Sequence, residues 1–224
     1  MTGLITLTEP RSAVAEAYRG LRTNLAFARP DAALRTLLVI SPAPDADKSV
    51  TLANLAVVTS QSGRRVIVVD CDLRRPAQHT LFSLSNDAGV TTTLVDDAAL
   101  VALPLRPTAV DGLEVLTSGP VPPNPAELLG SRRMGLLIER LAERADLVLF
   151  DAPPVIAVTD AAVLAPLVDG VLLVLAAGHS RRDHTARARE LLDKVGASVI
   201  GVVLTGVEQD ATGYGQYGSA GRGR

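Results

Sequence analysis

Residues 36–49 read TLLVISPAPDADKS, which is a run of β-branched and apolar residues, a short loop, and then Lys48-Ser49. The apolar run at 36–40 predicts a buried strand, and the residues at 48–62 predict a helix. A strand, a short loop, Lys-Ser and a helix in this order form the layout of a phosphate-binding P-loop. The stretch therefore predicts the start of an α/β fold with a phosphate site after its first strand.

The same alternation of strand and helix continues along the chain. Runs rich in Val, Ile and Leu predict six strands, at residues 36–40, 65–69, 114–117, 147–150, 171–175 and 198–204. Helices are expected at residues 12–28, 48–62, 131–144, 161–167 and 183–195. Because the strands are continuously apolar, they indicate burial on both faces. We expect a doubly wound α/β fold of the P-loop NTPase type, with a mostly parallel sheet and helices on both faces.

Length and composition predict one main domain. The chain has 224 residues, of which 47% are hydrophobic, enough for a single well-buried core. We divide it into an N-terminal arm helix (1–30), a P-loop domain (31–205) and a flexible tail rich in glycine (206–224). The net charge of −2 predicts no overall attraction to nucleic acid.

The sequence also predicts a cytoplasmic location. No apolar run approaches the roughly 18–20 residues of a membrane span, and the N-terminus lacks the pattern of a secretory signal. The single cysteine, Cys71, cannot form an internal disulfide. Between two aspartates it is expected to be a buried filler with a raised pKa. Because His79, His179 and His184 lack zinc-ligand spacing, we assign them no metal.

The loop before Lys48 departs from a working phosphate loop. Such loops use glycine because their backbone N–H groups must turn inward around the phosphates. Here Asp45 and Asp47 stand in the loop, and a carboxylate repels a polyphosphate. An isolated Lys-Ser pair usually just begins a helix. However, the chain has 20 Arg and only two Lys, so a lysine after a strand favours a phosphate loop of reduced affinity.

Carboxylates follow two further strands. Asp70 and Asp72 come at the end of the second strand at alternate positions, so they share one side, and Asp151 follows the fourth. The carboxyl ends of parallel strands meet at one edge of the sheet, so these groups should converge with Lys48. Any one of them alone would suit a solvated turn. Together they predict a magnesium and proton-transfer site, in which Arg74 offsets the repulsion between Asp70 and Asp72.

Several motifs in order resemble those of the bacterial tyrosine kinases (BY-kinases) that serve capsule and exopolysaccharide export. The resemblance spans roughly residues 9–204 and includes residues 122–129 and the segment Val158-Thr-Asp160-Ala. Its motifs are Lys48-Ser49, Asp70-x-Asp72-x-Arg74, Asp151-x-Pro153 and Glu16-x-x-Arg19-x-x-Arg22. The first three are similar to the Walker A, A′ and B motifs, and the fourth to the motif that joins subunits into a ring. The loop keeps Ser41 and Pro44 of the pattern S-x-x-P-G-x-G-K-S but not its glycines.

The resemblance implies an ATP- and Mg²⁺-dependent autokinase that regulates polysaccharide synthesis and export. Its residues divide by implied role into phosphate binding (Lys48, Ser49, Arg74), catalysis (Asp70, Asp72, Asp151), magnesium binding (Ser49, Asp72, Asp151) and phosphoacceptors (Tyr214, Tyr217). It further implies a homo-oligomeric ring and a separate membrane activator of the polysaccharide co-polymerase type, which would recruit the chain to the inner face of the membrane.

Two other interpretations stay open. The loop aspartates favour a catalytically weak regulatory or scaffold subunit of the co-polymerase. A partitioning ATPase of the Min or Par type fits less well, because that class carries a further lysine where this chain has Ala43.

The arm is expected to be an amphipathic helix capped by Ser12. Its inward face is predicted to hold Val14, Tyr18, Leu21 and Leu25, and its free face Glu16, Arg19 and Arg22. The resemblance implies that the free face contacts the next subunit.

Overall fold

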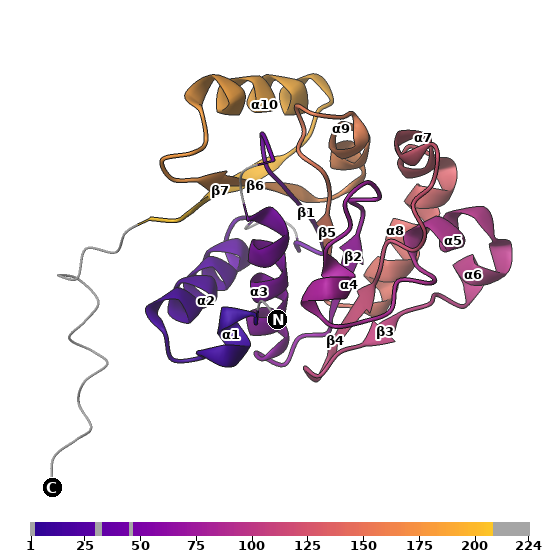
Figure 1. Cartoon of the computed structure of the whole chain (residues 1–224), viewed down its shortest axis with the longest axis horizontal. Helices are drawn as coiled ribbons and strands as arrows, with labels where there is room; N and C mark the ends of the chain where they lie inside the picture. Colours follow the sequence, from indigo (N-terminus) through magenta and orange to yellow (C-terminus); the bar gives the residue numbers. More distant parts are fainter. Residues whose placement is uncertain (1–2, 30–32, 45–46, 208–224) are drawn as a thin grey trace, which may run out of the picture.

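The computed structural model describes residues 3–29, 33–44 and 47–207, and Figure 1 shows how their elements are arranged. In chain order these are α1 (Ile5–Thr8), α2 (Ala13–Ala26), β1 (Thr36–Ile40), α3 (Lys48–Ser60), β2 (Val66–Asp70), α4 (Gln78–Leu81), α5 (Val90–Val95), α6 (Asp97–Val101), β3 (Arg106–Pro107), β4 (Leu113–Leu116), α7 (Pro125–Leu129), α8 (Arg132–Arg144), β5 (Leu147–Asp151), α9 (Asp160–Leu164), the 3₁₀ turn η1 (Ala165–Leu167), β6 (Gly170–Ala176), α10 (Arg182–Lys194) and β7 (Val199–Thr205).

The strands form one seven-stranded sheet in the order β3-β4-β2-β5-β1-β6-β7. Every neighbouring pair is parallel except β3 with β4. The predicted mostly parallel, doubly wound α/β fold is therefore confirmed, with all six expected strands present. The prediction missed β3, because a two-residue strand that includes a proline has no periodic pattern to detect.

Two hydrophobic cores lie on opposite faces of the sheet. Leu37 and Val39 of β1 pack on one face with α1, α2 and α3. Leu38 and Ile40, the alternate residues of the same strand, pack on the other face with helices α5 to α10. Both helical layers are visible in Figure 1. Burial on both sides explains why the strands are apolar without alternation.

The arm helix packs against α3 as part of the domain. Ser12 caps α2, since its Oγ accepts a hydrogen bond from the Ala15 N–H at 3.2 Å. Leu25 is buried in the core under α2, and Tyr18 and Leu21 pack at its edge. The cap and most of the predicted inward face are confirmed.

Two assignments on the arm were wrong. Val14, predicted to face inward, is 44% exposed in the first turn of α2. Arg22, predicted to lie on the free face, donates a hydrogen bond to the Val58 carbonyl of α3 at 3.0 Å. The reason is geometric, because Arg22 comes four residues after Tyr18 and so lies on the same face one turn later. Glu16 and Arg19 form an ion pair of 2.8 Å within α2.

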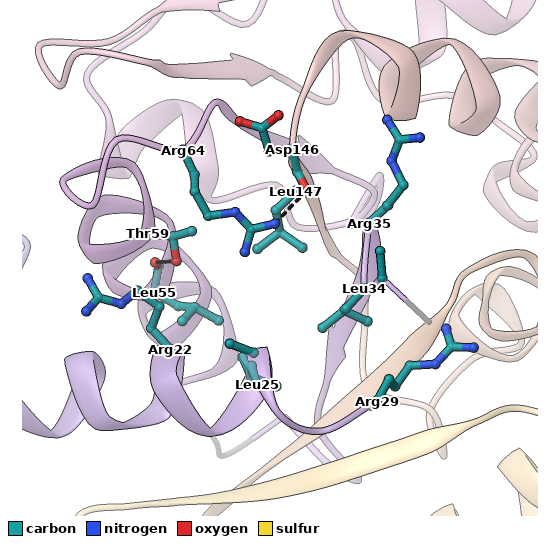
Figure 2. A pocket seen from close by; sticks show the side chains of 12 residues that line it. Arg22, Leu25, Arg29, Leu34, Arg35, Leu55, Thr59, Arg64, Asp146 and Leu147 are labelled. Atoms are coloured by element: carbon teal, nitrogen blue, oxygen red, sulfur yellow. Dashed lines mark hydrogen bonds between the residues drawn. The ribbon is translucent and has the colours of Figure 1, made fainter. Parts of the chain in front are cut away.

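A hollow of about 740 Å³ lies at the amino ends of the strands, between α2, α3, β1 and β5. Figure 2 shows Leu55 and Leu147 in it, with Arg64 reaching across and donating to the Asp146 carbonyl at 2.7 Å. Further arginines, Arg22, Arg29 and Arg35, line it. This hollow is at the opposite end of the sheet from the carboxylates predicted to form the functional site.

Within the described part of the chain, no helix combines the length and the hydrophobicity needed to cross a bilayer.

Candidate functional site

The predicted site residues meet at the carboxyl ends of three adjacent strands, β2, β5 and β1. The register of β2 with β5 places Asp70 directly opposite Asp151. Lys48 begins α3, just after the loop that leaves β1. Chain segments up to 103 residues apart are therefore brought to one point.

Lys48 is the centre of the cluster. Its Nζ donates to Asp151 Oδ1 at 2.8 Å, to Asp72 Oδ2 at 3.2 Å and to the Ser49 hydroxyl at 3.1 Å. The Lys48 and Asp72 side chains are 9% and 8% exposed and that of Asp151 is fully buried, so little solvent screens these contacts. The structure thus brings together Lys48, Ser49, Asp72 and Asp151, as the sequence predicted.

The electrostatics favour a charged lysine. Burial alone would lower the pKa of Lys48, but the negative charges of Asp151 and Asp72 and their hydrogen bonds outweigh it and raise that pKa. The ammonium is the counter-ion of two buried carboxylates. A phosphate that recruited Lys48 would have to compete with both of them.

Asp70 is held differently from the other two aspartates. Its Oδ1 accepts from the Asp72 N–H at 3.2 Å, and its Oδ2 accepts from the N–H groups of Ala77 and Gln78 at 3.0 and 2.9 Å. Burial, together with the charge of Asp151, raises the pKa of Asp70 to about 8, against the opposing effect of the backbone donors. Asp70 therefore fixes the course of the loop after β2 through its hydrogen bonds to the backbone.

Arg74 was predicted to offset the repulsion between Asp70 and Asp72, but the hydrogen bonds of its side chain go to another residue. Its guanidinium forms two hydrogen bonds with the Asp160 carboxylate, at 2.9 and 3.0 Å. Asp160 is fully buried at the start of α9, so this bidentate pair joins the loop after β2 to α9. A buried acidic partner satisfies Arg74 more completely than the aspartates of its own loop.

The loop before Lys48 is described only in part. The Ser41 hydroxyl donates to the Ala43 carbonyl at 2.8 Å, which makes a tight turn after β1. Asp47 is exposed and immediately precedes α3. The pKa of Tyr18 on α2 is raised, mainly by burial and to a lesser extent by the charge of Asp47, against the opposing effect of the Thr51 hydroxyl. Asp45 lies outside the described residues, as do the predicted phosphoacceptors Tyr214 and Tyr217.

Cys71 is fully buried, and burial, with the charges of Asp70, Asp151 and Asp72, raises its pKa well above the usual value. The predicted filler role with a raised pKa is confirmed. An unreactive thiol at this position follows from both effects.

Two residues of the site, Gln78 and Asp160, were not predicted as site residues, although Asp160 belongs to a segment that is similar to the family. Gln78 is fully buried at the start of α4, and its Nε2 donates to Asp151 Oδ2 at 2.7 Å. The sequence carried no direct signal for Gln78, because a polar residue in a short helix usually faces solvent. Both partners of these residues are distant in the chain, so spacing alone could not have revealed them.

The comparisons with known proteins agree with this geometry. Residues 37–216 match the family model described as the CobQ/CobB/MinD/ParA nucleotide binding domain. Tyrosine-protein kinase YwqD of Bacillus subtilis (strain 168) is 39% identical over 217 residues, which cover 96% of this chain and 91% of YwqD. This chain belongs to the bacterial tyrosine-kinase family.

Two solved structures from BY-kinase systems share the fold. The kinase domain of Escherichia coli tyrosine kinase ETK matches with a TM-score of 0.88 at 35% identity, covering 93% of this chain and 82% of that one. The chimerical protein CapA2B2 matches with a TM-score of 0.85 at 38% identity, covering 91% and 89%. The BY-kinase resemblance stated from the motifs is therefore confirmed.

The donor set fits the magnesium ion that nucleotide-binding proteins of this kind use. Carboxylate and hydroxyl oxygens are the ligands Mg²⁺ prefers, and the cluster offers Asp72, Asp151 and the Ser49 hydroxyl. Among the described residues, no group of three or more His, Cys, Asp or Glu side chains is arranged to hold a metal by itself. Mg²⁺ is usually bound by one or two carboxylates together with substrate phosphates.

Proposed function

We propose that this chain is an ATP- and Mg²⁺-dependent protein-tyrosine autokinase that regulates capsular or exopolysaccharide synthesis and export. The observation that carries the proposal is Lys48, a buried ammonium that links the start of α3 to Asp72 and Asp151 at the ends of neighbouring strands. An ammonium group beside two carboxylates and a hydroxyl is the set of groups that phosphoryl transfer requires.

In the proposed reaction, Lys48 and Ser49 bind the phosphates of ATP, and Arg74 joins them by exchanging its hydrogen bonds with Asp160 for phosphate oxygens. The tyrosine oxygen forms a bond to the γ-phosphorus while the bond from that phosphorus to the bridging oxygen breaks, and ADP leaves. Asp72 takes the phenolic proton, because Asp70, with its pKa of about 8, already holds a proton at neutral pH. Magnesium, held by Ser49, Asp72 and Asp151 together with the phosphates, would supply charge neutralisation.

The acceptors are proposed to be Tyr214 and Tyr217 of a neighbouring copy. Both lie in a sequence segment rich in glycine and polar residues, a composition that offers few apolar side chains for a core. Their replacement by phenylalanine in the full chain should remove the phosphotyrosine formed on incubation with Mg-ATP. Phosphotyrosine that persisted in this double variant would exclude the two tail residues as the main acceptors.

The ring contact of the family is proposed to involve the arm. Arg22 donates to the Val58 carbonyl in a partly buried contact, whereas Arg19 makes only exposed contacts, with Glu16 and the Pro10 carbonyl, so Arg19 is the better residue to test. Arg19→Glu should reduce the oligomer mass measured by light scattering at equal protein concentration. An unchanged mass would argue against this contact.

Other partners follow from the family. We propose a separate membrane activator of the polysaccharide co-polymerase type that holds the chain at the cytoplasmic face of the membrane, and no nucleic-acid partner.

A regulatory or scaffold subunit is the second candidate, favoured by Asp45 and Asp47 in the phosphate loop. Calorimetry with Mg-ATP on the full chain separates the two. Binding by the unmodified chain supports the kinase, and Asp45→Gly/Asp47→Gly should bind about tenfold more tightly or better. Binding only after glycine is restored would favour the scaffold.

A matched variant, Asp45→Asn/Asp47→Asn, separates charge from backbone shape. It removes the two negative charges but keeps side chains of the same size. If it recovers as much affinity as the glycine variant, repulsion of the phosphates is the main defect. If it recovers none, the loop needs glycine for its conformation.

A further inference from the structure

Gln78 lies inside the carboxylate cluster, although none of the phosphate-binding motifs includes it. It is the first residue of α4 and is fully buried. Its Nε2 donates to Asp151 Oδ2 at 2.7 Å and to the Ser49 carbonyl oxygen at 3.2 Å. Because both partners are acceptors, they fix which end of the carboxamide is the nitrogen. The side chain therefore joins α4 to the end of β5 and the start of α3.

This contact divides the two oxygens of Asp151 between different partners. Oδ1 accepts from Lys48, whereas Oδ2 accepts from Gln78. Lys48 is the partner that phosphates would recruit, so its departure would free Oδ1 alone. The bond from Gln78 would still hold Oδ2 and keep the carboxylate from turning about its side-chain bond.

The main chain of Gln78 is fixed as well. Its N–H donates to Asp70 Oδ2 at 2.9 Å, so both ends of the residue are held by aspartates. Its remaining polar atom, Oε1, is buried without a hydrogen-bond partner among the described residues. A buried acceptor left in this way is unusual for a purely structural residue.

We infer that Gln78 is a positioning residue for the metal-assisted part of nucleotide binding: its Nε2 holds Asp151 with Oδ1 directed to the phosphate loop. The inference rests on the proposed function and deepens it. It differs from a role in phosphate binding itself, because Gln78 acts through Asp151. Loss of the Nε2 donor should therefore weaken the effect of Mg²⁺ on affinity far more than affinity without Mg²⁺.

The test is calorimetry with ADP, which avoids turnover, on the full chain in excess Mg²⁺ and in EDTA. Gln78→Met has a similar length and no donor, and Gln78→Asn keeps the amide but is one methylene shorter. Thr80→Ala, on the exposed side of the same helix, is the control. We expect both Gln78 variants to lose about tenfold of the Mg²⁺-dependent gain in affinity, as is typical for residues that orient metal ligands. Affinity in EDTA should change less than twofold, and the control should match the parent.

The same comparison in the Asp45→Gly/Asp47→Gly background tests Gln78 even where the native loop binds weakly. Melting temperatures identify any variant that does not fold. If Gln78→Met does not fold, Gln78→Asn is compared with the parent instead. A full Mg²⁺-dependent gain in a folded Gln78 variant would overturn the inference and leave the kinase proposal intact. Equal losses with and without Mg²⁺ would also overturn it, because they indicate a general structural effect. Absence of ADP binding in both backgrounds would overturn both proposals.

Discussion

Replacing Lys48 with methionine tests whether its ammonium is the counter-ion of the site. The substitution keeps the length of the side chain but leaves Asp72 and Asp151 without the charge that contacts them at 3.2 and 2.8 Å. Removing one partner of a buried ion pair typically costs about 3–5 kcal/mol. For a chain of this size that corresponds to a loss of about 6–20 °C in melting temperature.

The assay is thermal unfolding at pH 8, followed by circular dichroism. Lys194→Met, which removes the other lysine from an exposed position in the last turn of α10, is the matched control and should change little. A melting temperature for Lys48→Met within about 2 °C of the parent at pH 8 would refute the counter-ion role.

Three further predictions concern the surroundings of the site. The pKa of Asp70 is raised from 3.8 to about 8, so Asp70 binds its proton more tightly in the folded chain than in the unfolded chain. Stability should therefore fall as pH rises from about 4 to about 8. In urea titrations, Asp70→Asn should remove up to about 1.4 kcal/mol per pH unit of that slope. Arg74→Leu should cost about 1 kcal/mol in urea unfolding, because Asp160 stays buried without its partner while the arginine itself is 41% exposed; an unchanged midpoint would show that the pair adds nothing. Gly89→Ala should lower the unfolding midpoint, because a Cβ at this position would lie 1.9 Å from a backbone carbonyl oxygen. Gly135→Ala is the control, since Gly135 has open space around it inside α8 and the change should be neutral or stabilising. Equal midpoints for the two variants would contradict this prediction.

The sequence predicted the layers of the fold because its strands carry a strong local signal. Continuous apolar runs such as 36–40 and 147–150 are typical of strands buried on both faces, so they predicted a parallel sheet. The short helices α4 to α7 escaped prediction, since four to six residues are too few to show a helical period.

The sequence predicted the site residues that directly follow strands. It missed the side-chain contacts between segments that are far apart in the chain. Lys48, Asp72 and Asp151 follow directly from the rule that strand ends share an edge. The bond from Gln78 to Asp151 and the pair between Arg74 and Asp160 join residues 73 and 86 positions apart. Such contacts depend on how loops fold over the sheet, which local patterns do not encode.

The network that surrounds Asp70 makes the phosphate loop a separable part of this protein. The loop after β2 is tied down by its own backbone N–H groups on Asp70 and by side chains on β5 and α9, all outside residues 41–47. Substitutions in the phosphate loop can therefore change ligand affinity without changing the arrangement of the carboxylates at the ends of β2 and β5. In evolutionary terms, a lineage could silence and later restore nucleotide binding through two positions while the rest of the catalytic apparatus persists.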